Sequence, residues 1–326
     1  MKLICGASNQ DLPAISDLCA VYASAGVHCI DVAADAAVVS AAREALDWVE
    51  DRQGVRPWLM ISLSDGKDAH FRKAWFDPQK CPTDCHRPCE QICPAKAIPS
   101  NGGVLRDRCY GCGRCISSCP LGIIEEQDRR VGLEDFSSLL NELRPDALEI
   151  HTAPGRSKNF NRALEQLMKA NVPLKRLSVS CGLQGYEITY EQLARELWRR
   201  YSCLSQFGQK PLWQLDGRRM SGDLGKGAAF VAVALWRKMR FLAPPGPLQL
   251  AGGTNSHTIS HLPKDYGPAG IAFGGIARKL IQPWLLEAQA RRISLRDWPE
   301  GWQDSLQAAK ELVKPWLSRN YYSHGC

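Results

Sequence analysis

The sequence has no apolar run of the length that a membrane-spanning helix needs, which is about 20 residues. Its first ten residues hold one lysine and a short apolar stretch that ends in polar residues. They lack the longer apolar segment and the small-residue cleavage site of a signal peptide. We therefore expect a cytoplasmic protein without a membrane span.

Long runs of positive charge are also missing. The formal net charge is +7, but no stretch holds five consecutive basic residues, and the densest points are pairs such as Arg129-Arg130. The electrostatic footprint of nucleic-acid binding is therefore weak, and we predict no nucleic-acid partner. Hydrophobic residues make up 44% of the chain and charged residues 23%. These proportions are typical of a folded globular chain and exclude a disordered one.

Cysteine, in contrast, is abundant. The chain has 14 cysteines, and most of them are clustered between Cys81 and Cys119. Disulfide frameworks belong to small secreted domains, whereas clustered cysteines in a larger cytosolic chain indicate metal. The cysteines outside the cluster are interpreted as ordinary core residues or, for the last, as a terminal residue: Cys5, Cys19, Cys29, Cys181, Cys203 and Cys326.

Short apolar runs alternate with longer segments of helical periodicity over most of the chain. This alternation predicts a parallel α/β fold. Eight strand–helix units in about 270 residues match a (β/α)₈ barrel. A doubly wound open sheet is the alternative, but no G-x-G-x-x-G follows the first strand. Strands are expected at 2–6, 29–33, 58–63, 147–152, 177–181, 212–215, 248–251 and 271–273, and helices at 12–25, 37–50, 133–143, 160–170, 190–201, 227–239, 277–291 and 302–316.

One segment, residues 76–130, interrupts the alternation after the third strand and is rich in Cys, Pro and Gly. We predict a discontinuous barrel-like domain of residues 1–75 and 131–326, with residues 76–130 as a ferredoxin-like insert. Loops that follow the strands of a barrel lie at its C-terminal face, where barrels carry their sites.

The second half of the insert contains the pattern C-x₂-C-x₂-C-x₃-C-P, made by Cys109, Cys112, Cys115 and Cys119-Pro120. It is the pattern of bacterial ferredoxins, in which three thiolates converge on one cluster and the fourth cysteine ligates a second. A Cys₄ zinc knuckle is the alternative, but such sites usually pair two distant C-x₂-C units.

The first half contains a variant run with three-residue spacers, Cys81, Cys85, Cys89 and Cys93-Pro94. The exchange rule of two-cluster ferredoxins predicts one cluster on Cys93, Cys109, Cys112 and Cys115, and the other on Cys81, Cys85, Cys89 and Cys119. We expect two [4Fe–4S] clusters, with [3Fe–4S] as the alternative for the irregular run. His86, next to Cys85, is an alternative ligand.

Glycine pairs follow the last two expected strands, at Gly252-Gly253 and Gly274-Gly275. The corresponding loops of barrels often bind phosphate through backbone N–H groups, so these four residues form a candidate anion site with Arg278 or Lys279 nearby. The alternative is that they only turn the chain. Residues 216–227 form a second loop whose mixture of glycine, acidic and basic residues suits a polar ligand or an ordered surface.

No catalytic residue is predicted. The sequence has no nucleophile elbow and no H-E-x-x-H, and His151, His257 and His261 have no recognisable metal-ligand spacing.

With its two tandem cysteine runs inside an α/β chain, the sequence resembles the LdpA (light-dependent period) family of iron–sulfur proteins from photosynthetic prokaryotes. Residues 214–218 and 221–223 support the resemblance, which covers nearly the whole chain. It implies a redox-responsive input to the circadian clock. The clusters would report photosynthetic electron transport, with a quinone or ferredoxin pool as donor, to clock and clock-input proteins. The alternative is an oxidoreductase whose clusters pass electrons to a substrate or flavin at the barrel mouth.

Overall fold

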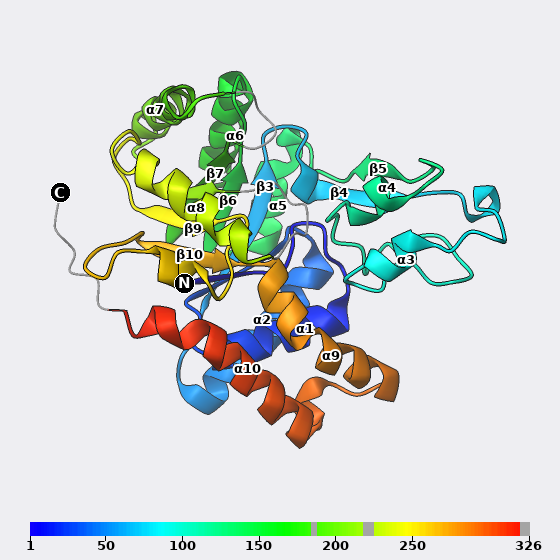
Figure 1. The fold of residues 1–326 in the computed structure, drawn as a ribbon. Coiled ribbons are helices and arrows are strands. Elements are labelled where there is room, and N and C mark those ends of the chain that lie inside the picture. Colours follow the sequence, from blue (N-terminus) through cyan, green and yellow to red (C-terminus); the bar gives the residue numbers. More distant parts are fainter. Residues whose placement is uncertain (184–187, 218–224, 320–326) are drawn as a thin grey trace.

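Eight parallel strands close into a barrel in the computed structural model, which describes residues 1–183, 188–217 and 225–319 (Figure 1). The first strand pairs with both the second and the last, and Lys2 lies opposite Ala272, so the sheet has no open edge. The predicted barrel is therefore confirmed over the open sheet. In barrel order along the chain the strands are β1 (Lys2–Ile4), β2 (Cys29–Ala33), β3 (Trp58–Ser64), β6 (Ala147–His151), β7 (Arg176–Gly182), β8 (Pro211–Asp216), β9 (Leu248–Ala251) and β10 (Gly270–Phe273).

Helices surround this barrel, as the alternation predicts, and a 3₁₀ turn, η4 (Thr258–His261), stands in place of a helix between β9 and β10. None of the helices in the described ranges is long and apolar enough to cross a membrane. The helices are α1 (Leu12–Ser24), α2 (Ala36–Gln53), α5 (Phe136–Leu143), α6 (Ser157–Ala170), α7 (Tyr190–Gln206), α8 (Lys226–Met239), α9 (Gly275–Arg291) and α10 (Pro299–Leu317).

Local signals explain where the elements begin and end. Asp35 caps α2 by accepting hydrogen bonds from the backbone N–H groups of Ala37 and Val38, and Gly54 ends the helix in the left-handed conformation. In the strands, apolar side chains such as Ile30 and Val32 are fully buried against the helices. Because side chains alternate along a strand, the residues between them face the barrel interior.

The insert rests on a pair of strands that the sequence pattern did not predict. β4 (Arg72–Trp75) pairs with β5 (Glu125–Asp128) in an antiparallel ribbon. Both strands are short and carry polar residues, so neither has a clear period-two apolar pattern. The expected boundary at residue 76 falls just after β4, and the ribbon joins the two ends of the insert.

Beyond the ribbon, the insert has two helices of five residues each, α3 (Pro88–Ile92) and α4 (Arg114–Ser118). It projects to one side of the barrel (Figure 1). Its interior is a small cluster separate from the barrel core: Ala74, Phe76, Cys89, Ala95, Ala97, Ile98, Cys109, Cys115 and Ile124.

Candidate functional site

Four cysteines of the insert, Cys93, Cys109, Cys112 and Cys115, interact with one another on the side of the insert that faces the barrel. Burial, followed by the neighbouring thiols of Cys112, Cys109 and Cys93, raises the pKa of Cys115 to about 12. The pKa of Cys112 is raised by burial and by the thiols of Cys93 and Cys109. We call these four residues the inner group. Four thiolates so placed repel one another unless a positively charged centre such as iron compensates them.

The other four cysteines form what we call the outer group: Cys81, Cys85, Cys89 and Cys119. Partial burial raises the pKa of Cys81, and the thiols of Cys85 and Cys119 raise it further. Cys89 interacts with Cys119 and Cys81 in the same way. Each group thus takes three cysteines from one run and one from the other. This is the sorting that the exchange rule predicts, while ligation itself stays a prediction.

Hydrogen-bond donors reach cysteine sulfurs in both groups. The backbone N–H of Ala97 donates to Cys93 Sγ at 3.2 Å, and that of Ala74 donates to Cys109 Sγ at 3.4 Å. Arg87 donates from Nη1 to Cys81 Sγ at 3.8 Å. Hydrogen bonds to cluster sulfurs are one of the means by which a protein sets the reduction potential of an iron–sulfur cluster. These hydrogen bonds to the cysteine sulfurs therefore fit a bound iron–sulfur cluster.

Two glycines shape the loop of the inner group. Gly111 and Gly113 have φ angles of 75° and 78°, which favour glycine. A Cβ atom on Gly111 would collide with the backbone carbonyl of Arg72, and one on Gly113 would collide with the guanidinium of Arg72. Arg72 also donates from Nε to the carbonyl oxygen of Gly111 at 2.9 Å. The sequence pattern gave no sign of Arg72, because it lies on the unpredicted strand β4.

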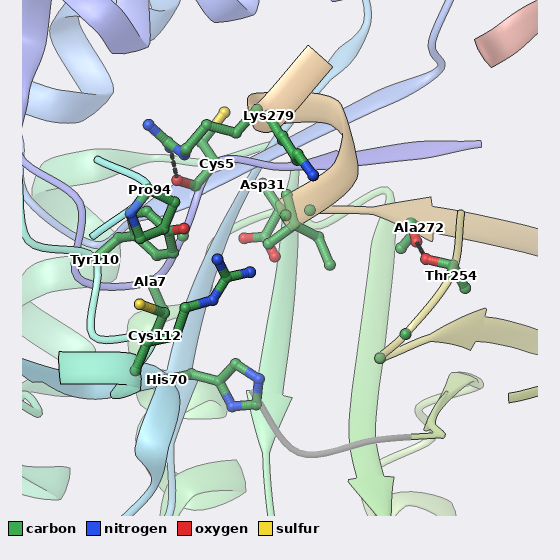
Figure 2. Close-up of a pocket in the computed structure, with 18 of the residues that line it drawn as sticks. Cys5, Ala7, Asp31, His70, Pro94, Tyr110, Cys112, Thr254, Ala272 and Lys279 are labelled. Atoms are coloured by element: carbon green, nitrogen blue, oxygen red, sulfur yellow. Dashed lines mark hydrogen bonds between the residues drawn. The ribbon is translucent and has the colours of Figure 1, made fainter. Parts of the chain in front are cut away.

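A cavity of about 510 Å³ lies between the inner group and the mouth of the barrel. From the insert it is lined by Cys93, Tyr110 and Cys112, and from the barrel rim by the two predicted glycine pairs and Lys279. Figure 2 shows the Cys112 side chain and the His70 ring at one side of this cavity, with Thr254 at the far side. The fold therefore places the candidate anion site, Gly252, Gly253, Gly274 and Gly275, beside the inner group.

Arg278 also lines the cavity, but its guanidinium already contacts groups of the protein. It is buried, donates from Nη2 to the carbonyl oxygen of Cys5 at 2.5 Å, and lies over the Tyr110 ring at 4.9 Å. It thus joins the barrel to the insert. Gly253 packs closely on α8, since an added Cβ would lie 3.0 Å from the carbonyl oxygen of Ala228. Anion binding stays a prediction.

Buried polar side chains form the floor of the cavity, inside the barrel. Lys2 Nζ lies 2.5 Å from Glu149 Oε2 and 3.6 Å from Asp31 Oδ2. Gln214 donates to Glu149 Oε1 at 2.8 Å, and Ser62 donates to Asp31 at 2.8 Å. Sequence reasoning missed this network. The available signal was a charged residue between apolar ones in two strands, at Ile30-Asp31-Val32 and Leu148-Glu149-Ile150.

The electrostatics of the floor keep charge in the barrel interior. Burial lowers the pKa of Lys2, but the carboxylates of Glu149 and Asp31 outweigh it and raise that pKa above its ordinary value. Burial raises the pKa of Asp31 to about 6. Despite its burial, His151 has its pKa raised to about 9 by Glu149 and Asp68. The floor therefore offers cations and carboxylates side by side at neutral pH.

Of the other predicted features, residues 218–224 lie outside the described part of the 216–227 loop, and its first residue, Asp216, lines the cavity. Cys5 also lines the cavity, and its sulfur lies 3.9 Å from that of Cys19. Cys181 is buried in the barrel core. His86 is exposed.

Two models of known protein families match this chain. Residues 139–315 match the light dependent period A C-terminal domain, and residues 81–130 match the LdpA Fe–S cluster-binding domain. The chain belongs to the light dependent period A family. It is 45% identical to Light dependent period A of Synechococcus elongatus, over 96% of this chain and 90% of that protein. The family resemblance is thus confirmed, and the LdpA cluster-binding match contains both cysteine runs.

Two further similarities are more limited. An uncharacterised ferredoxin of Methanocaldococcus jannaschii is 36% identical over 74 residues, which is 22% of this chain and 40% of that protein. A type I 3-dehydroquinate dehydratase from Clostridium difficile superposes with a TM-score of 0.40 and 8% identity, over 94% of this chain and 92% of that one.

Proposed function

We propose that this member of the light dependent period A family is a cytoplasmic redox sensor that carries two [4Fe–4S] clusters and relays the photosynthetic redox state to the circadian clock through protein partners. The inner group would hold one cluster and the outer group the other, with a three-iron cluster as the alternative in the outer group. The observation that supports this most is the sorting of eight cysteines into two groups of four across the two runs.

The two groups have different surroundings, which suits a relay. Three outer-group cysteines, Cys81, Cys85 and Cys119, are half-buried, against two in the inner group, so a redox donor from the quinone or ferredoxin pool can approach the outer cluster. Cys93 and Cys112 of the inner group border the cavity at the barrel mouth. An electron added to either cluster changes the charge in a poorly solvated part of the insert. The contacts of the insert with clock and clock-input proteins would change accordingly.

Cluster assignment can be tested by cysteine variants in anaerobically purified, full-length protein. The parent should carry about eight irons per chain, on the stoichiometry of two cubanes. Cys112→Ala and Cys93→Ala should remove the same cluster signal from the EPR spectrum, whereas Cys85→Ala and Cys119→Ala should remove the other. Cys203→Ala, outside both groups, is the control and should keep both signals. The assignment is refuted if Cys93→Ala removes the same signal as Cys85→Ala, or if the protein contains zinc without acid-labile sulfide.

The relay can be tested by measuring how strongly full-length clock-input proteins bind the immobilised protein in its oxidised and dithionite-reduced states. Retention should differ between the two states, and Cys85→Ala should abolish that difference. Equal retention in both states would refute the relay while leaving the cluster assignment intact.

The cavity favours a second candidate function, an oxidoreductase. It is bordered by inner-group cysteines on one side and by the Gly252, Gly253, Gly274 and Gly275 rim on the other. A substrate or flavin with a phosphate or carboxylate group could lie in it, its anion on the rim amides. A chromophore that co-purifies with the protein, or turnover with an added electron donor, would favour this function. Gly275→Val should then abolish binding if the rim holds the anion.

A further inference from the structure

Three side chains beside the cavity converge in a way that neither function explains. Asp68, His70 and His151 bring one carboxylate and two imidazoles together, with one ligand atom of each within 4.8 Å of the others. Asp68 Oδ1 lies 2.7 Å from His70 Nδ1, and Asp68 Oδ2 lies 3.8 Å from His151 Nδ1.

The barrel fold produces this convergence. Asp68 and His70 lie just beyond the end of β3, in and before the 3₁₀ turn η1 (Ala69–Phe71), and His151 is the last residue of β6. β3 and β6 are neighbours, and Ser64 at the end of β3 lies opposite His151. The three side chains therefore meet at the C-terminal rim, although His151 lies 81 positions after His70 in the chain.

The His151 ring is held in place from several sides. Its Nε2 lies 3.2 Å from Glu149 Oε1, which leaves Nδ1 directed at Asp68. The Phe71 ring packs edge-on against it at 5.3 Å, and the His70 ring lies 4.8 Å away. A histidine that binds metal through one nitrogen usually donates the other N–H to a carboxylate, which fixes its tautomer and orientation.

The distances between the ligand atoms of Asp68, His70 and His151 can be compared with those around a bound ion. Ligand atoms about 2.1 Å from a metal lie roughly 3 to 3.5 Å apart, whereas one ligand atom from each of the three residues lies within 4.8 Å of the others, so the side chains would have to move closer together to share an ion. Two further carboxylates lie near the histidines: Glu149, which also pairs with Lys2, contacts His151, and Asp216 interacts with both histidines. His70, His151 and Asp216 line the cavity, so a ligand in the cavity can reach the ion.

We propose that Asp68, His70 and His151 bind a single divalent first-row transition-metal ion at the barrel mouth, separate from the iron–sulfur clusters. Two histidines and one carboxylate are the donor set of open zinc and non-haem iron sites, in which other positions remain for an oxygen ligand. The cavity supplies the space for such a ligand, of which a carboxylate is the simplest class.

The test uses full-length, cluster-loaded protein under anaerobic conditions, with Mn²⁺ and Zn²⁺ as separate probes in equilibrium dialysis. Occupied clusters leave the eight cysteines of the insert unavailable, and Mn²⁺, which prefers oxygen and nitrogen to thiolate, discriminates against the remaining cysteines. We expect one equivalent of bound ion per chain beyond the iron. His70→Gln and Asp68→Asn should each weaken binding more than tenfold at unchanged iron content. His257→Gln, an exposed histidine of the same rim, is the matched control and should bind like the parent.

A second measurement does not depend on variants. Pulsed EPR of the Mn²⁺-loaded parent should detect the nitrogens of coordinated imidazole, even if a ligand variant fails to fold. The proposal is overturned if the parent binds no equivalent of either ion, if Mn²⁺ shows no imidazole nitrogen, or if the ligand variants bind as tightly as the parent. Because iron content is measured separately, failure here leaves the cluster assignment untouched.

Discussion

The barrel and the insert have cores made of different kinds of side chain. The barrel core is built from aliphatic and aromatic side chains packed between strands and helices, such as Leu18, Ile30 and Phe160. The insert has helices of five residues and a core in which three of the nine buried residues are cysteines: Cys89, Cys109 and Cys115. Helices that short have little stability of their own, and small cores usually need a metal or cross-links. The barrel is thus held by burial, whereas the insert depends on what its cysteines bind.

The two regions also differ in how they hold charge. Inside the barrel, Lys2 lies between Glu149 and Asp31, so opposite charges compensate each other within the chain. In the insert the interacting groups are thiols of like charge when ionised, which Arg87 and Arg114 compensate only in part and which bound iron would compensate further.

Removing the iron should separate the two regions most strongly. Chelation of the reduced protein is expected to unfold residues 76–130 and leave the barrel folded, because the cluster-binding free energy is the folding free energy of a small metal-dependent region. Hydrogen exchange resolved by segment is the measurement. Amides in the insert should lose protection while those of β6 and β7 keep it. Equal loss in both regions would contradict the contrast.

Lys2→Met should destabilise the barrel and leave the insert intact, the reverse of iron removal. It leaves Glu149 and Asp31 buried without their cation and is expected to lower the free energy of unfolding by about 3–5 kcal/mol without changing iron content. Denaturant unfolding of the chain measures this. Lys175→Met removes a half-exposed ion pair with Asp146 and should cost at most about 1 kcal/mol.

The same variant has a predictable pH dependence. The pKa of Asp31 is about 6 in the folded parent, above that of an unfolded Asp. A carboxyl group with a raised pKa binds its proton more tightly in the folded state, so its contribution to stability falls as pH rises through the folded pKa. Without Lys2 the pKa of Asp31 rises further. The deficit of Lys2→Met should therefore be larger at pH 8 than at pH 5, and a deficit independent of pH would contradict this.

Gly111→Ala should damage the insert alone. The added Cβ collides with the carbonyl of Arg72 at a φ angle of 75°. We expect about half of the iron to be lost, with the inner-group signal affected and the barrel unfolding transition unchanged. The matched control is Gly122→Ala, which has a φ angle of 62° but open space around the added atom. It should cost only about 1–2 kcal/mol of backbone strain and keep both clusters.

Asp35→Ala should have the smallest effect. It removes the side chain that caps α2 and is expected to lower the free energy of unfolding by about 1 kcal/mol. Thermal or denaturant unfolding measures it, with Asp51→Ala, an exposed residue near the other end of α2, as the control. Iron content should not change, and a loss of iron would show that the two regions are coupled through α2.

Much of this molecule could be predicted from local patterns. The eight barrel strands and their helices lie within a few residues of the expected ranges, because amphipathic periodicity and helix caps are local properties. The cysteine runs were recognisable because cluster ligation depends on short spacers. β4 and β5 were not, since their short polar strands are stabilised by pairing with each other across the insert. For the same reason Arg72 could not be connected with Gly111 in advance.

The sequence by itself determined the order of strands and helices, the place of the insert and the eight cysteines, because spacing and periodicity act over a few residues. Only the tertiary structure decided which side chains meet. Closure of the barrel aligns the ends of β3 and β6, so that Asp68 and His70 reach His151. It also turns Lys2, Asp31 and Glu149 from three separate strands into one buried network. Contacts of this kind depend on strand register across the whole barrel, and no local pattern in the chain encodes them.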